Sequence, residues 1–217
     1  MRKKQSFFEK VWAQNLISNV GENYDMLHVD RNFIHDLSGA RALTSIQDKR
    51  AQVKHPHLTF AAPDHTVLTQ PGIEQYGDRY DHCIKPLRQY SEDQKIKYFD
   101  YKDEKFGIIH VIGPELGLTL PGLVIVCGDS HTCTHGGLGA LAWGIGASEV
   151  EHVLATGTVL QSKPKTLQIN INGYLSKGVV AKDVILHVIA SQGADVGVGF
   201  AVEFEGTTIR ASSVENR

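Results

Sequence analysis

The sequence predicts an α/β fold in which a mostly parallel sheet is flanked by layers of helices. Short apolar runs of strand length interleave with amphipathic segments of helix length along the whole chain. Residues 123–127 are apolar at every position, which is typical of a strand that is covered on both faces. The 217 residues suit one large domain or two small ones, and a hydrophobic content of 41% is enough for a core.

Helices are predicted from capping residues and from apolar spacing. Ser6 and Glu9 form a capping-box pattern, and Ser148 and Glu151 form a second one. Asp36 or Ser38 can cap another helix, and apolar residues at helical spacing follow residue 181. The predicted helices cover residues 6–17, 38–46, 81–95, 148–160 and 181–191.

Strands are predicted from short apolar or alternating runs. We expect them at residues 26–29, 58–61, 96–99, 107–111, 123–127, 166–172 and 200–204. Asp30 and Arg31 should end the first strand, and Pro63 closely follows the second. No internal repeat interrupts this order, and the one weak boundary between subdomains is expected at residues 161–165.

Polar side chains follow several of the predicted strands. Asp64 and His65 follow residues 58–61, and His110 lies in or near the end of residues 107–111. Asp129, together with its neighbours Ser130 and His131, follows the buried run. Ligands bind beyond the carboxyl ends of strands in open α/β sheets, so these groups should converge on one cleft. An aspartate beside a histidine can make the imidazole a proton donor or acceptor near neutral pH.

Other interpretations of these residues remain open at this stage. His110 is also consistent with a hydrogen-bonded core histidine, and Asp64 with a helix cap or a turn. The glycine-rich run at residues 136–146 is compatible with close helix packing. His131 and His135 have the i,i+4 spacing of zinc ligands but lack the intervening glutamate of that motif. The run also lacks the third glycine and the later acidic residue of a dinucleotide-binding fingerprint.

Composition narrows the classes of partner. The formal net charge of −2 gives no reason to expect a nucleic acid or an anionic membrane as partner. No apolar run approaches the ~20 residues of a membrane span. The three cysteines, Cys83, Cys127 and Cys133, contain no C-x-x-C pair. A reducing, cytoplasmic compartment is therefore expected, and an iron–sulfur cluster held by this chain alone is not.

The motifs taken together resemble those of the aconitase superfamily, and most closely its family of 3-isopropylmalate dehydratase large subunits. The resemblance covers about residues 6–217 and includes the early stretch at residues 24–35. Its most specific part is Cys-Gly-Asp-Ser-His-Thr with the glycines that follow. The matching segments are residues 64–65, 107–110, 113–115, 120–122, 127–132 and 148–156.

The resemblance implies a reversible hydro-lyase that interconverts 2-isopropylmalate and 3-isopropylmalate in leucine biosynthesis. It implies a small hydroxy-dicarboxylate substrate and a 4Fe-4S cluster with one open iron, which acts as a Lewis acid on the hydroxyl. The roles it implies are catalytic for Asp64, His65, His110, Asp129 and His131, with Asp64 and His65 on the acid side. Ser130 and His35 would bind substrate.

The chain departs from the family pattern at the cluster. The family's cluster cysteines lie further along, in a lone Cys and a C-x-x-C, so no metal ligand is assigned to this chain. We expect a piece that ends before those cysteines and is inactive without the C-terminal part of the large subunit and the small subunit. Alternatives are a component of a homoaconitate, citramalate or maleate-type hydro-lyase, a non-catalytic carboxylate-binding module, and a metal hydrolase using Asp64, His65, Asp129 and His131.

Overall fold

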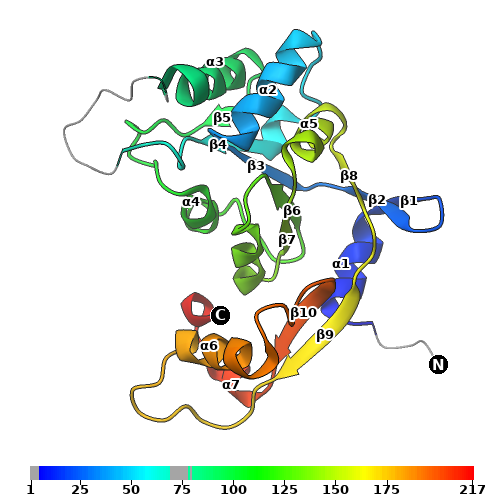
Figure 1. Cartoon of the computed structure of the whole chain (residues 1–217), viewed down its shortest axis with the longest axis vertical. Helices are drawn as coiled ribbons and strands as arrows, with labels where there is room; N and C mark the ends of the chain where they lie inside the picture. The colour runs from blue at the N-terminus through cyan, green and yellow to red at the C-terminus, as the bar shows by residue number, and fades with distance from the viewer. Residues whose placement is uncertain (1–4, 69–77, 79) are drawn as a thin grey trace.

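A five-stranded parallel sheet forms the centre of the larger part of the molecule (Figure 1). The computed structural model describes residues 5–68, 78 and 80–217. The strands lie in the order β5-β4-β3-β6-β7, and every neighbouring pair is parallel. The chain steps outward from β3 to β5 and returns to β6 beside β3. The topological switch point, where ligands bind in such sheets, therefore lies between β3 and β6. The strands are β3 (Arg31–His35), β4 (Thr59–Ala62), β5 (Lys97–Tyr98), β6 (Val124–Cys127) and β7 (Leu141–Gly144).

Helices cover both faces of this sheet, as the apolar run at residues 123–127 predicts. One face packs on α2 (Ser38–Asp48), α3 (Lys85–Asp93) and α5 (Ala147–Thr156). The opposite face packs on α4 (Ile109–Glu115) and the 3₁₀ segment η3 (Thr132–Leu138). All four residues of β6 are buried. Its side chains alternate between the two cores, with Val126 in the first and Ile125 and Cys127 in the second.

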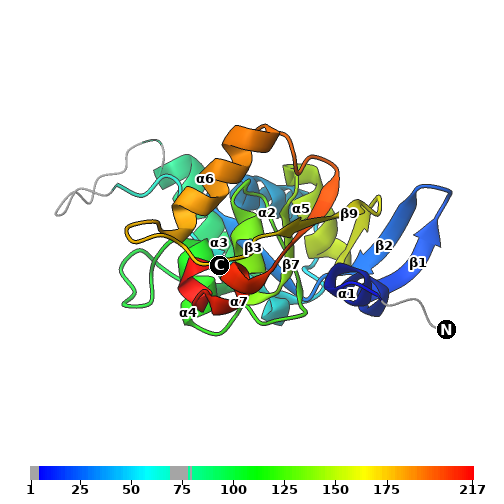
Figure 2. The same cartoon turned by 90° about the horizontal axis from the view of Figure 1, so that it is seen from below.

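Two smaller sheets complete the fold. An antiparallel sheet contains β1 (Leu16–Val20), β2 (Tyr24–His28) and β8 (Thr158–Gln161) in that order. A parallel pair joins β9 (Lys165–Asn170) to β10 (Phe200–Glu205), and α6 (Ala181–Gln192) and α7 (Thr207–Ala211) flank β9 in the view from below (Figure 2). The remaining elements are α1 (Phe7–Asn15), η1 (Pro56–Leu58), η2 (Tyr80–Ile84) and η4 (Val214–Asn216).

The α/β class and the buried central strand are confirmed, whereas several element assignments are wrong. Residues 107–111 were expected to form a strand, but Ile109 opens helix α4. β3, the centre of the main sheet, begins at Arg31, where the sequence predicts only a break. The glycine-rich run, for which helix packing was an open alternative, contains the end of η3 and strand β7. Two predicted helices are shorter, because β1 begins at Leu16 and β8 at Thr158.

The chain passes from one sheet to another near the expected boundary. β8 belongs to the antiparallel sheet and β9 to the parallel pair, and residues 162–164 connect them. A subdomain boundary at residues 161–165 stays a prediction. Among the helices of the described residues, none combines the length and apolar character that crossing a membrane requires.

Candidate acid–base site

Loops from the carboxyl ends of three neighbouring strands meet beside the switch point. His35 is the last residue of β3, and Asp36 follows it. Asp64 and His65 follow β4, and Asp129 follows β6. His110 joins them from the first turn of α4, on one face of the sheet. The convergence predicted for these side chains is therefore present in the structure, although His110 arrives on a helix and not on a strand.

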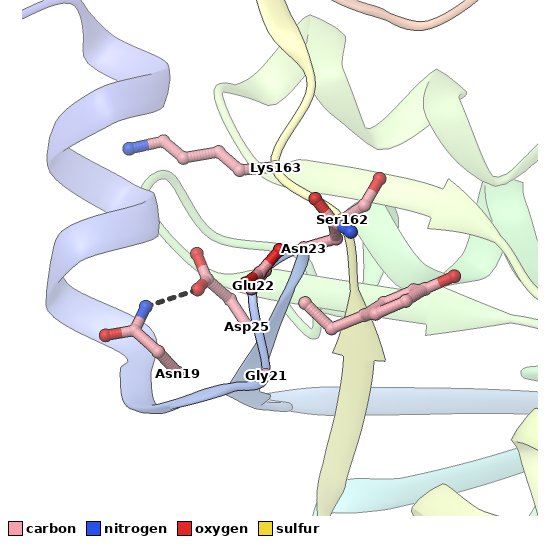
Figure 3. A pocket seen from close by; sticks show the side chains of 8 residues that line it. Asn19, Gly21, Glu22, Asn23, Asp25, Ser162 and Lys163 are labelled. Atoms are coloured by element: carbon pink, nitrogen blue, oxygen red, sulfur yellow. Dashed lines mark hydrogen bonds between the residues drawn. The ribbon is translucent and has the colours of Figure 1, made fainter.

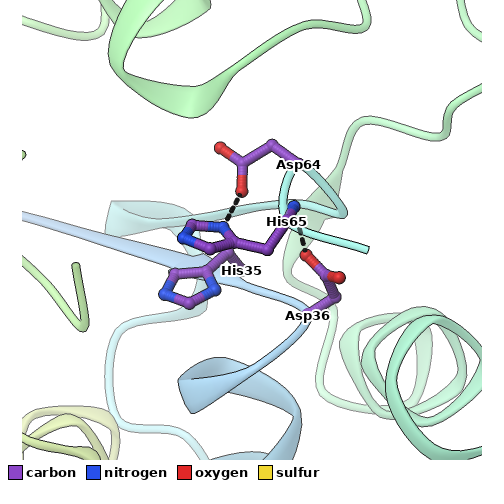
Figure 4. A group of neighbouring side chains, drawn as sticks. All are labelled: His35, Asp36, Asp64 and His65. Carbon is purple, nitrogen blue, oxygen red and sulfur yellow. Dashed lines mark hydrogen bonds and ion pairs between the residues drawn. The ribbon is translucent and has the colours of Figure 1, made fainter. Parts of the chain in front are cut away.

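His65 lies at the centre of the site, between two carboxylates. Its Nδ1 lies 2.6 Å from Oδ1 of Asp64, as drawn in Figure 4, and its Nε2 lies 2.9 Å from Oδ2 of Asp129. The hydrogen bond to Asp64, aided by Asp129 and opposed by partial burial, raises the pKa of His65 to about 9. At neutral pH the ring is therefore an imidazolium that donates to both aspartates. Because its side chain is 30% exposed, it can still reach a ligand.

Asp64 links His65 to helix α4. One carboxylate oxygen accepts from the His65 ring, and the other accepts the backbone N–H of Ile109 at 2.8 Å. That N–H is one of the groups that a helix start leaves unpaired. Asp64 is therefore both a helix cap and the partner of His65, so the two interpretations that the sequence left open hold together. Its side chain is only 2% exposed, which limits competition from water.

Asp129 receives hydrogen bonds from several sides. Its Oδ2 accepts from His65, and its Oδ1 accepts from the His131 backbone N–H at 2.6 Å and from Nε2 of His110 at 3.1 Å. Burial favours the neutral carboxyl, but these donors outweigh it and lower the pKa of Asp129 to about 2. Asp129 is therefore an acceptor throughout the neutral range, and the groups facing it must donate.

The end of β3 and the residue that follows it support His65. The imidazole of His35 stacks on that of His65, with ring centroids 3.9 Å apart and planes inclined by 18°. Asp36, which is fully buried, accepts the backbone N–H groups of His65 and Thr66 at 3.0 and 2.8 Å and also bonds the Thr66 hydroxyl. The sequence suggested Asp36 only as a helix cap. Because the sequence does not predict β3, it gives no signal that Asp36 directly follows a strand and belongs to the site.

Two predicted site residues lie at the rim. The His131 side chain is 81% exposed and approaches Oδ1 of Asp129 at 3.2 Å. Ser130 is exposed, and its hydroxyl lies 3.5 Å from the His131 ring. His131 also diverges from His135, which is fully buried, so the i,i+4 pair does not face a common ion. The structure thus brings five of the seven predicted residues together and leaves Ser130 and His131 at the edge.

The four residues of Figure 4 are also the one group, among the described residues, whose potential ligand atoms lie within 4.8 Å of one another. Their polar atoms are already engaged. His35 accepts the Leu37 N–H on Nδ1 and donates from Nε2 to the Gly128 carbonyl at 2.9 Å, and Asp36 is occupied by backbone donors. The arrangement therefore fits a hydrogen-bonded cluster better than a metal centre, which weakens the metal-hydrolase alternative.

The three cysteines do not supply a thiolate set. Cys127 is buried at the end of β6, where burial raises the pKa of its thiol. Cys133 is exposed on η3, and Cys83 is half-buried on η2. No cysteine belongs to a metal-binding group in the part of the chain that the structure describes. These residues do not fit as ligands of an iron–sulfur cluster.

A concavity lies away from this site, between the β1–β2 hairpin and residues 162–163 (Figure 3). It is an open depression of about 650 Å³ with mostly polar walls. Asp25 in its wall is engaged locally, because it accepts from the Asn19 amide at 2.6 Å and from the Trp12 indole at 2.7 Å. None of the predicted site residues lines it. Its lining residues are Asn19, Gly21, Glu22, Asn23, Tyr24, Asp25, Ser162 and Lys163.

Fold and site together define an α/β protein with a hydrogen-bonded carboxylate–imidazole cluster at the switch point of a parallel sheet. Residues 9–217 match the Aconitase family (aconitate hydratase). The chain belongs to the aconitase family.

Several curated relatives are similar over nearly the whole chain. The 3-isopropylmalate dehydratase large subunit 1 of Bradyrhizobium diazoefficiens is 47% identical over 213 residues, which is 98% of this chain and 45% of that protein. The 3-isopropylmalate dehydratase large subunits of Staphylococcus epidermidis and Oenococcus oeni are each 44% identical, over 98% and 99% of this chain and 47% of theirs. The chain thus spans slightly less than half the length of these relatives.

Proposed function

We propose that this chain supplies the proton-donating half of the active site of a hydro-lyase that interconverts 2-isopropylmalate and 3-isopropylmalate. The observation that carries the proposal is the imidazolium of His65, held between Asp64 and Asp129 and still partly exposed. The names of the relatives support the reaction and the substrate. A place in leucine biosynthesis belongs to the same proposal.

In the proposed dehydration, the C–O bond of the substrate breaks and the hydroxyl leaves as water. His65 donates the proton from Nε2 to the departing oxygen, and the neutral ring keeps its Nδ1–H bond to Asp64. The neighbouring C–H bond supplies the electron pair of the new double bond, and its proton goes to a base. Rehydration adds water in the opposite sense: its oxygen bonds to the carbon that lost the proton, and its spare proton returns to His65. The base returns its proton to the carbon that lost the hydroxyl, which gives the other isomer. A pKa of about 9 suits this residue to donation at neutral pH.

The described site lacks two things that this reaction needs. Its charged groups are three aspartates, Asp36, Asp64 and Asp129, and one imidazolium, an arrangement that repels a dicarboxylate substrate. All its carboxylates are engaged with nearby donors, which leaves no free base. We therefore propose that the base, the cationic substrate-binding groups and the cysteines of a 4Fe-4S cluster come from the rest of a large subunit and from a small subunit. A reducing, cytoplasmic setting belongs to the same proposal.

The test is turnover of isopropylmalate by the assembled enzyme, containing this chain, the remainder of the large subunit and the small subunit. His65→Ala should lower turnover by about 10²–10⁴-fold, the usual contribution of a general acid, while iron content stays unchanged. His57→Ala is the matched control, because His57 is exposed in η1 just before β4, at the opposite end of the strand from His65. Near-normal turnover of the His65→Ala enzyme with full iron content would remove His65 from the mechanism.

The same assay separates the alternatives that share this chemistry. Homoaconitate, citramalate and maleate would be offered in parallel, because none of the site residues described here selects the side chain of the hydroxy acid. A non-catalytic carboxylate-binding module is disfavoured by the excess of negative charge at the site. Saturable binding of isopropylmalate to this chain alone, measured by calorimetry, would favour that alternative instead.

A further inference from the structure

A line of buried hydrogen bonds runs inward from Asp129, away from His65. Nε2 of His110 lies 3.1 Å from Oδ1 of Asp129, and Nδ1 of the same ring lies 3.0 Å from Nε2 of His135. Nδ1 of His135 then lies 2.9 Å from the hydroxyl of Thr119. Two imidazoles in series thus connect a buried threonine to an aspartate of the site.

The negative charge of Asp129 at one end determines the direction of hydrogen-bond donation along this line. Asp129 is ionised at neutral pH and only accepts, so Nε2 of His110 can hydrogen-bond to it only in the ring tautomer that carries its hydrogen on Nε2. Burial lowers the pKa of His110, although Asp129 opposes the shift, and burial together with His110 lowers the pKa of His135 to about 4. Both rings are therefore neutral, and each carries a single hydrogen. Nδ1 of His110 must then accept from Nε2–H of His135, and Nδ1 of His135 must accept from the Thr119 hydroxyl.

The surroundings of His135 leave it little freedom. Its side chain is completely buried and Thr119 is nearly so. The Phe33 ring packs edge-on against the imidazole, with centroids 5.1 Å apart. Gly113 of α4 lies so close that a Cβ there would approach both the His135 ring and the Thr119 hydroxyl at 3.2 Å. The ring is thus held in one orientation by packing as well as by hydrogen bonds.

We propose that His135 and Thr119 are positioning residues that hold His110 in its Nε2–H tautomer, so that His110 permanently donates to Asp129. Neither residue touches the exposed part of the site. They act through His110, which fixes the orientation of the carboxylate that also receives His65. The catalytic consequence rests on the function proposed above, whereas the tautomer itself is a property of this chain.

The tautomer can be measured directly on the chain labelled with ¹⁵N-histidine. Imidazole nitrogen shifts distinguish a protonated nitrogen from an accepting one, and a scalar coupling across the N–H···N bond identifies the two partners. We expect an accepting Nδ1 and a protonated Nε2 in His110, with a coupling between its Nδ1 and Nε2 of His135. A His110 ring protonated on Nδ1, or a His135 ring protonated on Nδ1, would overturn the proposal.

Paired substitutions test whether the inner residues cause this state. His135→Gln keeps an N–H donor close to the position of Nε2, whereas His135→Phe removes it and keeps a flat ring. Thr119→Ser keeps the hydroxyl, and Thr119→Val removes it at nearly the same volume. We expect a single His110 tautomer in the Gln and Ser variants and a mixture of tautomers in the Phe and Val variants. If His110 keeps only its Nε2–H tautomer in folded His135→Phe and Thr119→Val chains, His135 and Thr119 do not determine that tautomer.

Turnover in the assembled enzyme then separates this proposal from the proposed function. We expect His135→Phe to lower kcat about tenfold, which corresponds to about 1.4 kcal/mol in the activation free energy, because the hydrogen bond from His110 to Asp129 is weakened. KM should change little, and His135→Gln should recover the activity. If the tautomers behave as expected but kcat does not change, the positioning of His110 stands and its part in the hydro-lyase reaction falls.

Discussion

Two regions of this molecule use the same kind of local structure and bury it to different extents. In the five-stranded sheet, β3 and β6 are almost entirely buried and α2 contributes five buried residues. In the region of β9 and β10 the strands are half-buried or exposed, and α6 contributes no buried residue. The parallel pair lacks the neighbouring strands that flank β3 and β6. The candidate site therefore lies where parallel strands have neighbours on all sides.

The largest predicted effect on the free energy of unfolding concerns one leucine in α2 and one in α6. Leu43 of α2 is 1% exposed and Leu186 of α6 is 50% exposed. Leu43→Ala should lower the free energy of unfolding by about 2–5 kcal/mol, because it leaves a cavity in a packed core. Leu186→Ala should change it by about 0.5 kcal/mol or less. Urea denaturation of the two variants measures the contrast, and equal losses would mean that α6 is as well packed as α2.

A second, smaller contrast concerns two aspartates that each accept backbone N–H groups. Asp36 is buried beneath His65, whereas Asp183 accepts the Val180 N–H at the exposed start of α6. Asp36→Asn places an amide donor against buried N–H groups and should cost about 1–3 kcal/mol. Asp183→Asn should cost about 0.5 kcal/mol, since water can replace the bond. The same unfolding measurement applies, and a larger loss for Asp183 would contradict the difference in burial.

The smallest effect is a pH dependence that only the site region should carry. The pKa of His65 is raised from 6.5 to about 9 by Asp64 and then Asp129. Its contribution to stability is fully present below pH ~6.5 and is lost as the pH rises through ~9. The stability advantage of the wild type over His65→Gln should therefore shrink across this range, by about 1 kcal/mol because the ring is partly exposed to screening solvent. His187→Gln, on the exposed side of α6, is the control, and an advantage that does not change over this range would contradict the paired imidazolium.

Prediction from the sequence succeeded mainly where the pattern was local and failed where tertiary contacts decided. One local prediction is wrong: the capping box expected at Ser148 and Glu151 is absent, because Gly146 is the N-cap of α5 and its N–H bonds to Glu149. The strand at residues 123–127 and the capping box at Ser6 depend only on residues close in sequence, and both predictions are confirmed. Residues 107–111 form a helix start because Asp64, 45 residues away, accepts the Ile109 N–H. Spacing along the chain cannot display such a cap.

The same distinction applies to the site. Aspartates and histidines at strand ends could be identified from the sequence because parallel strands deliver their ends to one edge. Thr119 and His135 could not be identified as positioning residues in this way. Thr119 precedes β6 and belongs to no catalytic sequence motif. The only signal that the sequence gives for His135 is its i,i+4 spacing from His131, which is typical of two ligands of one zinc ion. In the structure the His131 ring is exposed and the His135 ring is buried in the core. His131 is the N-cap of η3 and His135 lies within it.

Asp64 holds a backbone group of α4 with one oxygen and the ring of His65 with the other. For anyone redesigning this part of the protein, residues 64–65 and the first turn of α4 behave as one exchangeable block. A new loop after β4 that omits the carboxylate would release the helix carrying His110 as well as the ring of His65. Grafts that transfer the two segments together keep both bonds, so they should be tolerated more often than grafts of either segment alone.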